Sequence, residues 1–331
     1  MKKIILITGG AGFIGSFVCR EILNKTQYTP LIVDVFNQYV EPLKIYNIES
    51  RYLRFYDIKD KIIIKRANCA RYSVMRNIIE EYKPEYIIHL AAVPLAKIED
   101  ASIEDFREGT IDATANMLNI IFELKQKYNF KKFIYTSSSM IYGNFSEEPV
   151  KETHPTKPIN VYGTMKLAGE IVTRGLCNRY DINYLIIRPS AVYGPTDVNG
   201  RVSQIFIEKA FRGEKLVIKG ADERLDFSYV KDVARGFVQA ILSDCTDKTF
   251  NLTRGEARTI LEFAQIVKKY FPKIKIEISQ ERDKERPKRG ALDITRARRL
   301  FNYSPEYNLE KGIKEYIEYI RKNKLIEKIK K

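Results

Sequence analysis

The sequence predicts an α/β fold in which a doubly wound parallel sheet is followed by a smaller C-terminal α/β lobe. Short apolar, β-rich runs alternate with segments of helical period over the first half of the 331 residues, and parallel strands need such helical crossovers. After about residue 190 the elements become shorter and mixed, which indicates a second lobe. We expect the first lobe at 1–188 and the second mainly at 189–331, with a segment from about 226 to 250 returning to the first.

Each element of the first lobe has its own pattern. The predicted strands are KIILIT (3–8), PLIVDV (30–35), KIIIKRA (61–67), EYIIHLAA (85–92), KKFIYTSSS (131–139) and NYLIIRPSAVYG (183–194). The predicted helices between them are 12–23, 73–82, 113–128 and 162–180. In the second lobe, the mixed segments 203–220 and 259–278 precede a closing helix at 309–322.

Composition limits the class of protein. Apolar residues make up 44% of the chain and charged residues 30%, as in globular proteins with a buried core. The four cysteines lack paired spacing and no run approaches the roughly 18 apolar residues of a membrane span, so we expect a cytoplasmic protein without disulfides, a metal site or a membrane anchor. The net charge of +15 is spread along the chain without a nucleic-acid motif, so a nucleic-acid partner is not expected.

Four glycines stand within seven positions at the end of the first predicted strand, in IILITGGAGFIGS (4–16). A strand, a glycine turn and a helix beginning near Phe13 form the phosphate-binding turn of a Rossmann-type fold. Gly9 permits the tight turn, Gly12 lets a pyrophosphate approach the backbone, and Gly15 lets helix and strand pack closely.

The next strand ends in Asp34, where a carboxylate can accept hydrogen bonds from both ribose hydroxyls of an adenosine. A 2′-phosphate would face this carboxylate, and no basic residue follows before Lys44. The sequence therefore predicts NAD rather than NADP as cofactor.

A tyrosine and a lysine four residues apart supply the candidate catalytic groups. The YxxxK pattern occurs at Tyr128 and Lys132, at Tyr162 and Lys166, and at Tyr307 and Lys311. Only Tyr162 opens a predicted helix after a strand that ends in serines, at the sheet edge where a dinucleotide lies. The ordinary pKa of tyrosine is about 10, so we expect the Lys166 ammonium and a nicotinamide ring to lower the pKa of Tyr162 for use as a base.

These motifs together resemble the extended short-chain dehydrogenases/reductases of the NAD-dependent epimerase/dehydratase type, nearly from end to end. The motifs that carry the resemblance are TGGAGFIG (8–15), HLAA (89–92), SSSMIYG (137–143), YGTMK (162–166), RPSAVYGP (188–195) and RLDFSYVKDVA (224–234). The resemblance implies a catalytic triad of Ser138, Tyr162 and Lys166.

The resemblance also implies the ligand contacts. For the cofactor they are Gly9, Gly12, Phe13, Ile14, Gly15, Asp34, Asn68, Cys69, Leu90, Ala91, Ala92, Tyr162, Lys166 and Pro189. For the substrate they are Ser138, Ser139 and Tyr162, with Arg224 and Arg286 on the diphosphate of a nucleotide sugar, a task that suits the guanidinium fork. A homodimer is implied through the helix at about 112–126 and the helix bearing Tyr162.

The sequence departs from the family pattern at three places. Asn68 stands where an acidic residue often contacts adenine, and Ala191 stands where many relatives have an asparagine near the sugar diphosphate. Ser139 and Met140 occupy the positions where 4,6-dehydratases of the family carry an Asp-Glu pair, and elimination without a carboxylate is hard to arrange.

The chain has two histidines, neither of which we expect to act in catalysis. His89 ends a buried strand and is expected to make a structural hydrogen bond. His154 is expected at the surface, in a loop that borders the site.

The resulting hypothesis is a nucleotide-sugar epimerase that acts at C4 through a transient 4-keto sugar, with a UDP-hexose as the expected substrate. A 4-ketoreductase or dehydrogenase would use the same residues, and a dehydratase-like member is the other enzymatic alternative. A dinucleotide-sensing or RNA-binding member without catalysis is the alternative from another class, against which the intact triad argues.

Overall fold

The computed structural model describes residues 2–37, 45–93, 102–281 and 286–330. Seven strands of this described part form one parallel sheet in the order β11-β6-β5-β4-β1-β2-β3. They are β1 (Ile4–Thr8), β2 (Thr29–Asp34), β3 (Ile63–Arg66), β4 (Tyr86–His89), β5 (Lys132–Thr136), β6 (Tyr184–Arg188) and β11 (Lys248–Asn251). The strand order reverses between β1 and β4, which is the switch point of a doubly wound sheet. The predicted fold class is confirmed.

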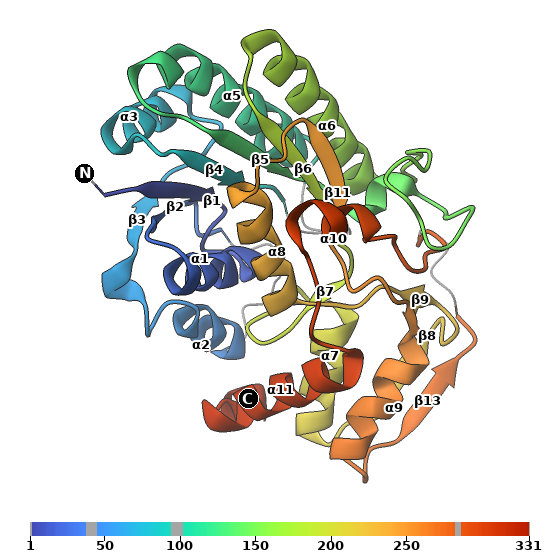
Figure 1. The fold of residues 1–331 in the computed structure, drawn as a ribbon. Coiled ribbons are helices and arrows are strands. Elements are labelled where there is room, and N and C mark those ends of the chain that lie inside the picture. The colour runs from blue at the N-terminus through green and yellow to red at the C-terminus, as the bar shows by residue number, and fades with distance from the viewer. Residues whose placement is uncertain (1, 38–44, 94–101, 282–285, 331) are drawn as a thin grey trace.

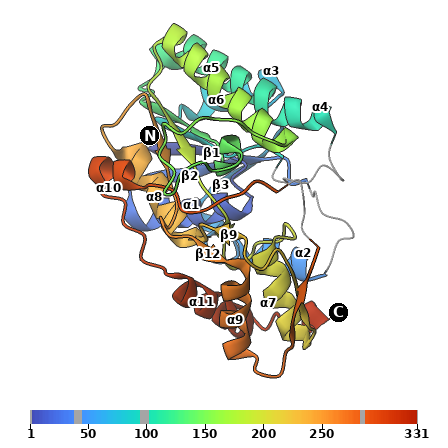
Figure 2. The ribbon, with the colours of Figure 1, turned by 90° about the vertical axis from the view of Figure 1, so that its right-hand side faces the viewer.

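Helices cover both faces of this sheet (Figures 1 and 2). One face carries α1 (Phe13–Lys25), α8 (Val230–Leu242) and α10 (Thr295–Phe301), and the other carries α3 (Tyr72–Tyr82), α5 (Ala113–Leu124) and α6 (Val161–Tyr180). The isoleucines, leucines and valines of the central strands alternate between the two apolar cores, because successive side chains of a strand point to opposite faces. The strands are therefore buried on both sides.

The second lobe has its own apolar core. Its helices are α7 (Val202–Arg212), α9 (Ile260–Tyr270), α11 (Leu309–Lys322) and α12 (Ile326–Lys330). Its strands form pairs: β7 (Val192–Tyr193) with β10 (Ser228–Tyr229), β9 (Arg224–Leu225) with β12 (Arg258–Thr259), and β8 (Leu216–Lys219) with β13 (Ile276–Ser279). Figure 2 shows α7, α9 and α11 together below the sheet.

Two segments cross between the lobes. The chain leaves the second lobe after β10, forms α8 against α1, and adds β11 to the sheet edge beside β6. In the other direction α2 (Ile45–Leu53), which belongs to the first half of the chain, packs on the second lobe, since the buried Tyr46 joins that core and Glu49 pairs with Lys328 at 3.4 Å. The division at residue 188 stays a proposal.

Two further elements lie near the site. The short helix α4 (Ile103–Phe106) begins at a capping box formed by Ser102 and Asp105, and it continues through a π-helical stretch at 107–112 into α5. Within the described residues, no helix combines the length and apolar character that crossing a membrane requires.

Candidate active site

A cavity of about 1100 Å³ opens at the carboxyl ends of the parallel strands, between the two lobes. Ligands bind at this edge in open α/β sheets. Its walls include the predicted residues Gly9, Gly12, Phe13, Ile14, Gly15, Asp34, Asn68, Cys69, Leu90, Ala91, Ala92, Ser138, Ser139, Tyr162, Lys166, Pro189 and Arg286. Of the residues predicted from the sequence, Arg224 alone is not part of this wall.

The glycine turn joins β1 to α1, as expected from the sequence. Gly9 has a φ of +66°, and a Cβ atom there would lie 2.7 Å from the backbone nitrogen of Ala91. A Cβ atom on Gly15 would lie 2.6 Å from the Cα of Gly10. Side chains at either position would therefore displace the turn, which leaves backbone at the positive end of α1 facing the cavity.

Asp34 lies at the end of β2 with its carboxylate held by the backbone. Its Oδ2 accepts a hydrogen bond from the nitrogen of Ala11 at 3.0 Å, and its Oδ1 accepts one from Phe36 at 2.7 Å. Burial raises the pKa of Asp34, while these bonds and the charges of Arg54 and Arg51 oppose that rise. The carboxylate oxygens keep capacity for ribose hydroxyls, because each oxygen can accept more than one bond.

The sequence argument about basic residues near Asp34 needs a correction. Lys44 lies outside the described residues, but α2 brings Arg51 into the cavity wall, where its charge acts on Asp34. Sequence distance did not reveal this neighbour because the approach depends on how α2 packs.

Asn68 and Cys69 follow β3. The Asn68 side chain donates to Glu108 Oε1 at 3.1 Å and accepts from the backbone nitrogen of Ala70 at 2.9 Å, so its amide is fixed in orientation. Cys69 is buried, and burial raises the pKa of its thiol to about 12. Cys69 is therefore a neutral wall residue at pH 7.

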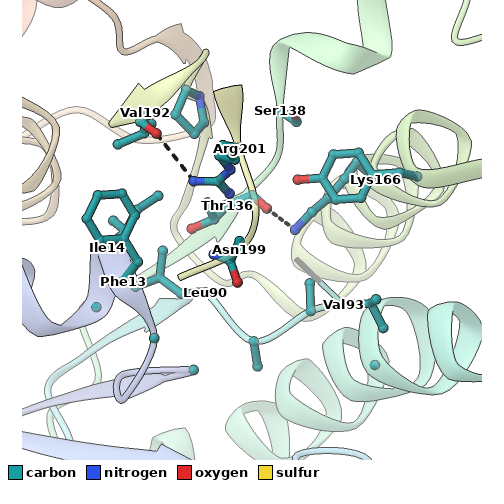
Figure 3. Close-up of a pocket in the computed structure, with 18 of the residues that line it drawn as sticks. Phe13, Ile14, Leu90, Val93, Thr136, Ser138, Lys166, Val192, Asn199 and Arg201 are labelled. Atoms are coloured by element: carbon teal, nitrogen blue, oxygen red, sulfur yellow. Dashed lines mark hydrogen bonds between the residues drawn. The ribbon is translucent and has the colours of Figure 1, made fainter. Parts of the chain in front are cut away.

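The structure brings Ser138, Tyr162 and Lys166 together in the cavity wall. Figure 3 shows Ser138 and Lys166 at this place. Ser138 follows β5, where its Oγ accepts from the backbone nitrogen of Met140 at 3.2 Å. Asn160 caps α6 by accepting from the Gly163 nitrogen, so Tyr162 lies in the first turn and Lys166 one turn later. The Lys166 ammonium donates to the carbonyl of Thr136 at 2.8 Å and lies 6.0 Å from the centre of the Tyr162 ring.

The expected lowering of the tyrosine pKa is wrong for the protein by itself. Burial raises the pKa of Tyr162, and the groups that oppose it are the charge of Arg201 and a hydrogen bond with Ser138. Burial also lowers the pKa of Lys166 to about 8. The physical reason is desolvation, which disfavours the charged form of both groups.

The candidate diphosphate arginines are arranged differently from one another. Arg224 forms a 2.6 Å ion pair with Glu148, whereas Arg286 lies in the cavity wall, 3.6 Å from Glu223. Arg289, which the sequence reasoning missed, also lines the cavity, and its buried Nε has no hydrogen-bond partner among the described residues. The sequence signal that could have indicated Arg289 is its position three residues after Arg286.

Sequence reasoning also missed Asn199 and Arg201, which line the cavity from the segment between β7 and α7. The Asn-Gly pair at 199–200 is a turn signal just before an apolar helical run, and it marks this segment as a loop. Nothing in the sequence indicates that the loop faces Tyr162.

The structure confirms the expectation for one of the two histidines and contradicts it for the other. His89 is buried and its Nδ1 bonds to the Thr8 hydroxyl at 2.7 Å, which confirms the structural interpretation. His154 is also buried and contacts the Ser146 hydroxyl through Nε2 at 2.9 Å. The expectation of a surface position for His154 is wrong, because its ring packs against Tyr142 and Phe145.

Residues 5–252 match the model of the NAD dependent epimerase/dehydratase family. The chain belongs to this family. As a member it is an enzyme of the extended short-chain dehydrogenase/reductase class, and its cofactor is NAD. The glycine turn without room for Cβ atoms, the positive end of α1 and the half-buried Asp34 fit such a dinucleotide.

Several epimerases of the family are similar to this member over nearly their whole length. The UDP-glucose 4-epimerase of Mycolicibacterium smegmatis is 29% identical, covering 96% of this chain and 98% of its own. The UDP-glucuronate 4-epimerase of Thermodesulfobacterium geofontis is 27% identical, with 98% of both chains covered. The crystal structure of UDP-glucose 4-epimerase from Thermotoga maritima with UDP-glucose is 28% identical, with a TM-score of 0.85 over 96% of this chain and 99% of its own. Proteins named dTDP-glucose 4,6-dehydratase match at 24–25% identity.

Proposed function

We propose that this protein is a nucleotide-sugar epimerase that inverts C4 of a UDP-linked sugar through a transient 4-keto form. The observation that carries the proposal is the convergence of Ser138, Tyr162 and Lys166 at the strand ends beside a turn shaped for a dinucleotide. The cavity of about 1100 Å³ exceeds what one drug-sized ligand needs and suits a cofactor and a substrate side by side.

The chain's own groups handle the proton and the orientation of the sugar. NAD, when bound, would supply the acceptor for the C4 hydride and the donor for its return. Tyr162 takes the proton of the C4 hydroxyl as the keto group forms, and it gives that proton back to the product alkoxide. Ser138, which is hydrogen-bonded to Tyr162, orients the same oxygen. Lys166 is held by Thr136 and keeps a cation near the phenol.

The carboxylates of the cavity wall favour epimerisation over elimination. Those in the described part of the wall are Asp34, Asp105 and Glu108. Asp34 binds two backbone nitrogens, Asp105 caps α4, and Glu108 accepts from Asn68. Ser139, at a position where dehydratases carry an acid, instead donates to the Ser190 hydroxyl at 3.0 Å. Among the described carboxyl groups of the wall, none is committed to removing a hydroxyl as water.

The same three catalytic residues would serve a 4-ketoreductase or a dehydrogenase, so the reaction must be tested directly. We expect the purified protein, without added cofactor, to interconvert a UDP-sugar and its 4-epimer from either side. The product from substrate deuterated at C4 should keep its deuterium, because the hydride returns to the carbon it left. Mass spectrometry and NMR of the products would measure both. Net one-way oxidation or reduction would exclude epimerisation.

A pair of tyrosine variants separates catalysis from folding. Tyr162→Phe should lower kcat by about 10³-fold or more, since it removes the group that exchanges the proton. Tyr307→Phe is the matched control, because Tyr307 also precedes a lysine by four residues yet bonds to Glu315 in the second lobe. Turnover should persist in Tyr307→Phe, and comparable turnover in Tyr162→Phe would contradict the proposed role.

We also propose that the protein works as a cytoplasmic homodimer joined through α5 and α6. On these helices Phe122 is 45% exposed and Ile171 is 61% exposed, and Phe122 stacks on Tyr180 at 4.3 Å. Exposed apolar side chains on adjacent helices suit a partner surface. The four free thiols are compatible with a reducing compartment. Light scattering that gives the mass of one chain would contradict the dimer.

A further inference from the structure

The loop before α7 places a guanidinium in the cavity, at the end that contains Tyr162. Arg201 is the residue that precedes α7, and its side chain is about one-third exposed, at 35%. Figure 3 shows Arg201 beside Val192, with Ser138 and Lys166 on the other side of it in this view. Burial raises the pKa of Tyr162, and the charge of Arg201 opposes that rise. Arg201 therefore shares the cavity wall with Tyr162.

Most of the Arg201 fork is not used by the described residues. Nη1 donates to the carbonyl of Val192 at 3.3 Å and lies 3.5 Å from Asp197 Oδ2, and both distances are long for an arginine bond. Asp197 is buried and its field also acts on Arg54, so one carboxylate serves two guanidinium groups. Among the described residues, no hydrogen bond from Nη2 or Nε of Arg201 is formed. A positive charge with free donors remains.

The diphosphate of a nucleotide sugar does not account for this charge. Arg286 and Arg289 form a separate cationic pair, since the charge of Arg286 lowers the pKa of Arg289. Two guanidinium groups that repel each other in a cavity wall suit a doubly charged diphosphate. Arg286 and Arg289 reach the cavity from the segment after β13, whereas Arg201 reaches it from the loop before α7 and bonds to the Val192 carbonyl. The cavity wall therefore has two separate positively charged regions, one at Arg286 and Arg289 and the other at Arg201.

We propose that Arg201 binds a carboxylate on the sugar, and that the preferred substrate is a nucleotide-linked hexuronic acid. This inference rests on the proposed function. The C6 group is attached to C5, the neighbour of the reacting C4, so it lies close to Tyr162 when C4 does. A neutral C6 hydroxyl would accept one hydrogen bond, whereas a carboxylate accepts two parallel bonds from the guanidinium and cancels its charge.

The test compares an acidic and a neutral substrate pair in wild-type protein and in Arg201→Gln. We expect wild type to have a higher kcat/KM for UDP-glucuronate than for UDP-glucose. Arg201→Gln should lower the ratio of these two values by about 30-fold or more, because a charge-assisted bidentate contact is lost for the acid alone. Arg201→Lys should recover part of the ratio.

Arg289→Gln is the matched control from the same cavity wall. It should weaken the binding of UDP, which has the diphosphate but no hexose, and lower kcat/KM for both substrates alike. The affinity of Arg201→Gln for UDP should stay within about twofold of wild type. Circular dichroism and thermal unfolding of each variant would show that it is folded.

Four results would contradict this inference or the proposed function on which it rests. A loss of UDP affinity in Arg201→Gln would make Arg201 a diphosphate contact. An equal fall in kcat for both sugars would make it a support for Tyr162 only. Epimerisation of UDP-glucose by a wild type that rejects UDP-glucuronate would overturn this inference and leave the proposed function standing. Failure with both sugars would instead overturn the proposed function.

Discussion

Lys166 and Lys311 show what residue spacing can and cannot define. Both follow a tyrosine by four residues, and the Lys311 ammonium lies nearer its tyrosine ring, at 4.2 Å against 6.0 Å for Lys166. Lys166 is buried, donates to Thr136 and lines the cavity, whereas Tyr307 bonds to Glu315 in the second lobe. The position at the strand ends, rather than the closeness of the pair, makes Tyr162 and Lys166 the candidate site.

The buried ammonium of Lys166 predicts a dependence of stability on pH. Its pKa is lowered from 10.5 to about 8 by burial, so the folded state binds fewer protons than the unfolded state between these values. The cost of burying the charge is fully present below pH 8 and disappears as pH rises to 10.5. Relative to Lys166→Met, wild type should therefore gain on the order of 3 kcal/mol in free energy of unfolding from pH 7 to pH 10. Urea unfolding of both proteins measures this difference, and a constant difference would contradict the prediction.

At the scale of an element, helix α6 depends on a glycine. The Tyr135 hydroxyl donates to the carbonyl of Lys166 at 3.2 Å, and a Cβ atom on Gly169 would overlap the Tyr135 ring and hydroxyl. Tyr135 is buried on β5, three residues before Ser138, so it has little room to move. Gly169 thus lets α6 approach the sheet closely enough to present Lys166 at the cavity.

Two alanine substitutions in α6 test this interpretation. Gly169→Ala should lower the free energy of unfolding by about 1–3 kcal/mol, because the overlap forces buried groups apart. Gly175→Ala should raise it by about 0.4–1 kcal/mol, since no heavy atom lies within 4 Å of its Cβ position and alanine suits a helix better. Urea unfolding gives both values. Equal effects of the two substitutions would argue against close packing at Gly169.

At the scale of the whole molecule, Arg54 ties the two lobes together at the cofactor turn. Its Nη1 donates to the carbonyl of Ala11 at 2.9 Å, and its Nη2 donates to the carbonyl of Thr196 at 2.6 Å. Ala11 belongs to the glycine turn, and Thr196 belongs to the segment that leads to Arg201. One buried side chain therefore positions both walls of the cavity.

Removing this link should weaken both folding and cofactor binding. Arg54→Met leaves two carbonyl groups without their donor, and we expect a loss of about 2–4 kcal/mol in free energy of unfolding with weaker affinity for NAD. Arg299→Met, at an exposed position of α10, is the control and should change stability by less than about 0.5 kcal/mol. Denaturant unfolding and NAD titration measure both effects. Unaltered NAD affinity in Arg54→Met would contradict the positioning role.

The sequence by itself determined the fold class and the cofactor end of the site. Apolar runs of strand length, separated by helical periods, predict a parallel sheet because each pattern depends on local geometry. The glycine turn and Asp34 were predictable for the same reason, since the backbone allows few residue types at a tight turn such as Gly9. The sequence also predicted Tyr162 and Lys166 as a pair, because they stand one helical turn apart in a helix that follows a strand ending in serines.

Only the tertiary structure decided the charges around the substrate. Arg201, Arg289 and Arg51 reach the cavity from separate segments, and no local rule states which surface arginine will face inward. The rise in the pKa of Tyr162 could not be predicted from the sequence either, because desolvation depends on all the groups packed around the phenol. A turn or a helical pair depends on residues that are adjacent in sequence. Electrostatic fields and burial depend on the whole folded chain, and these two properties determine which sugar the cavity can accept.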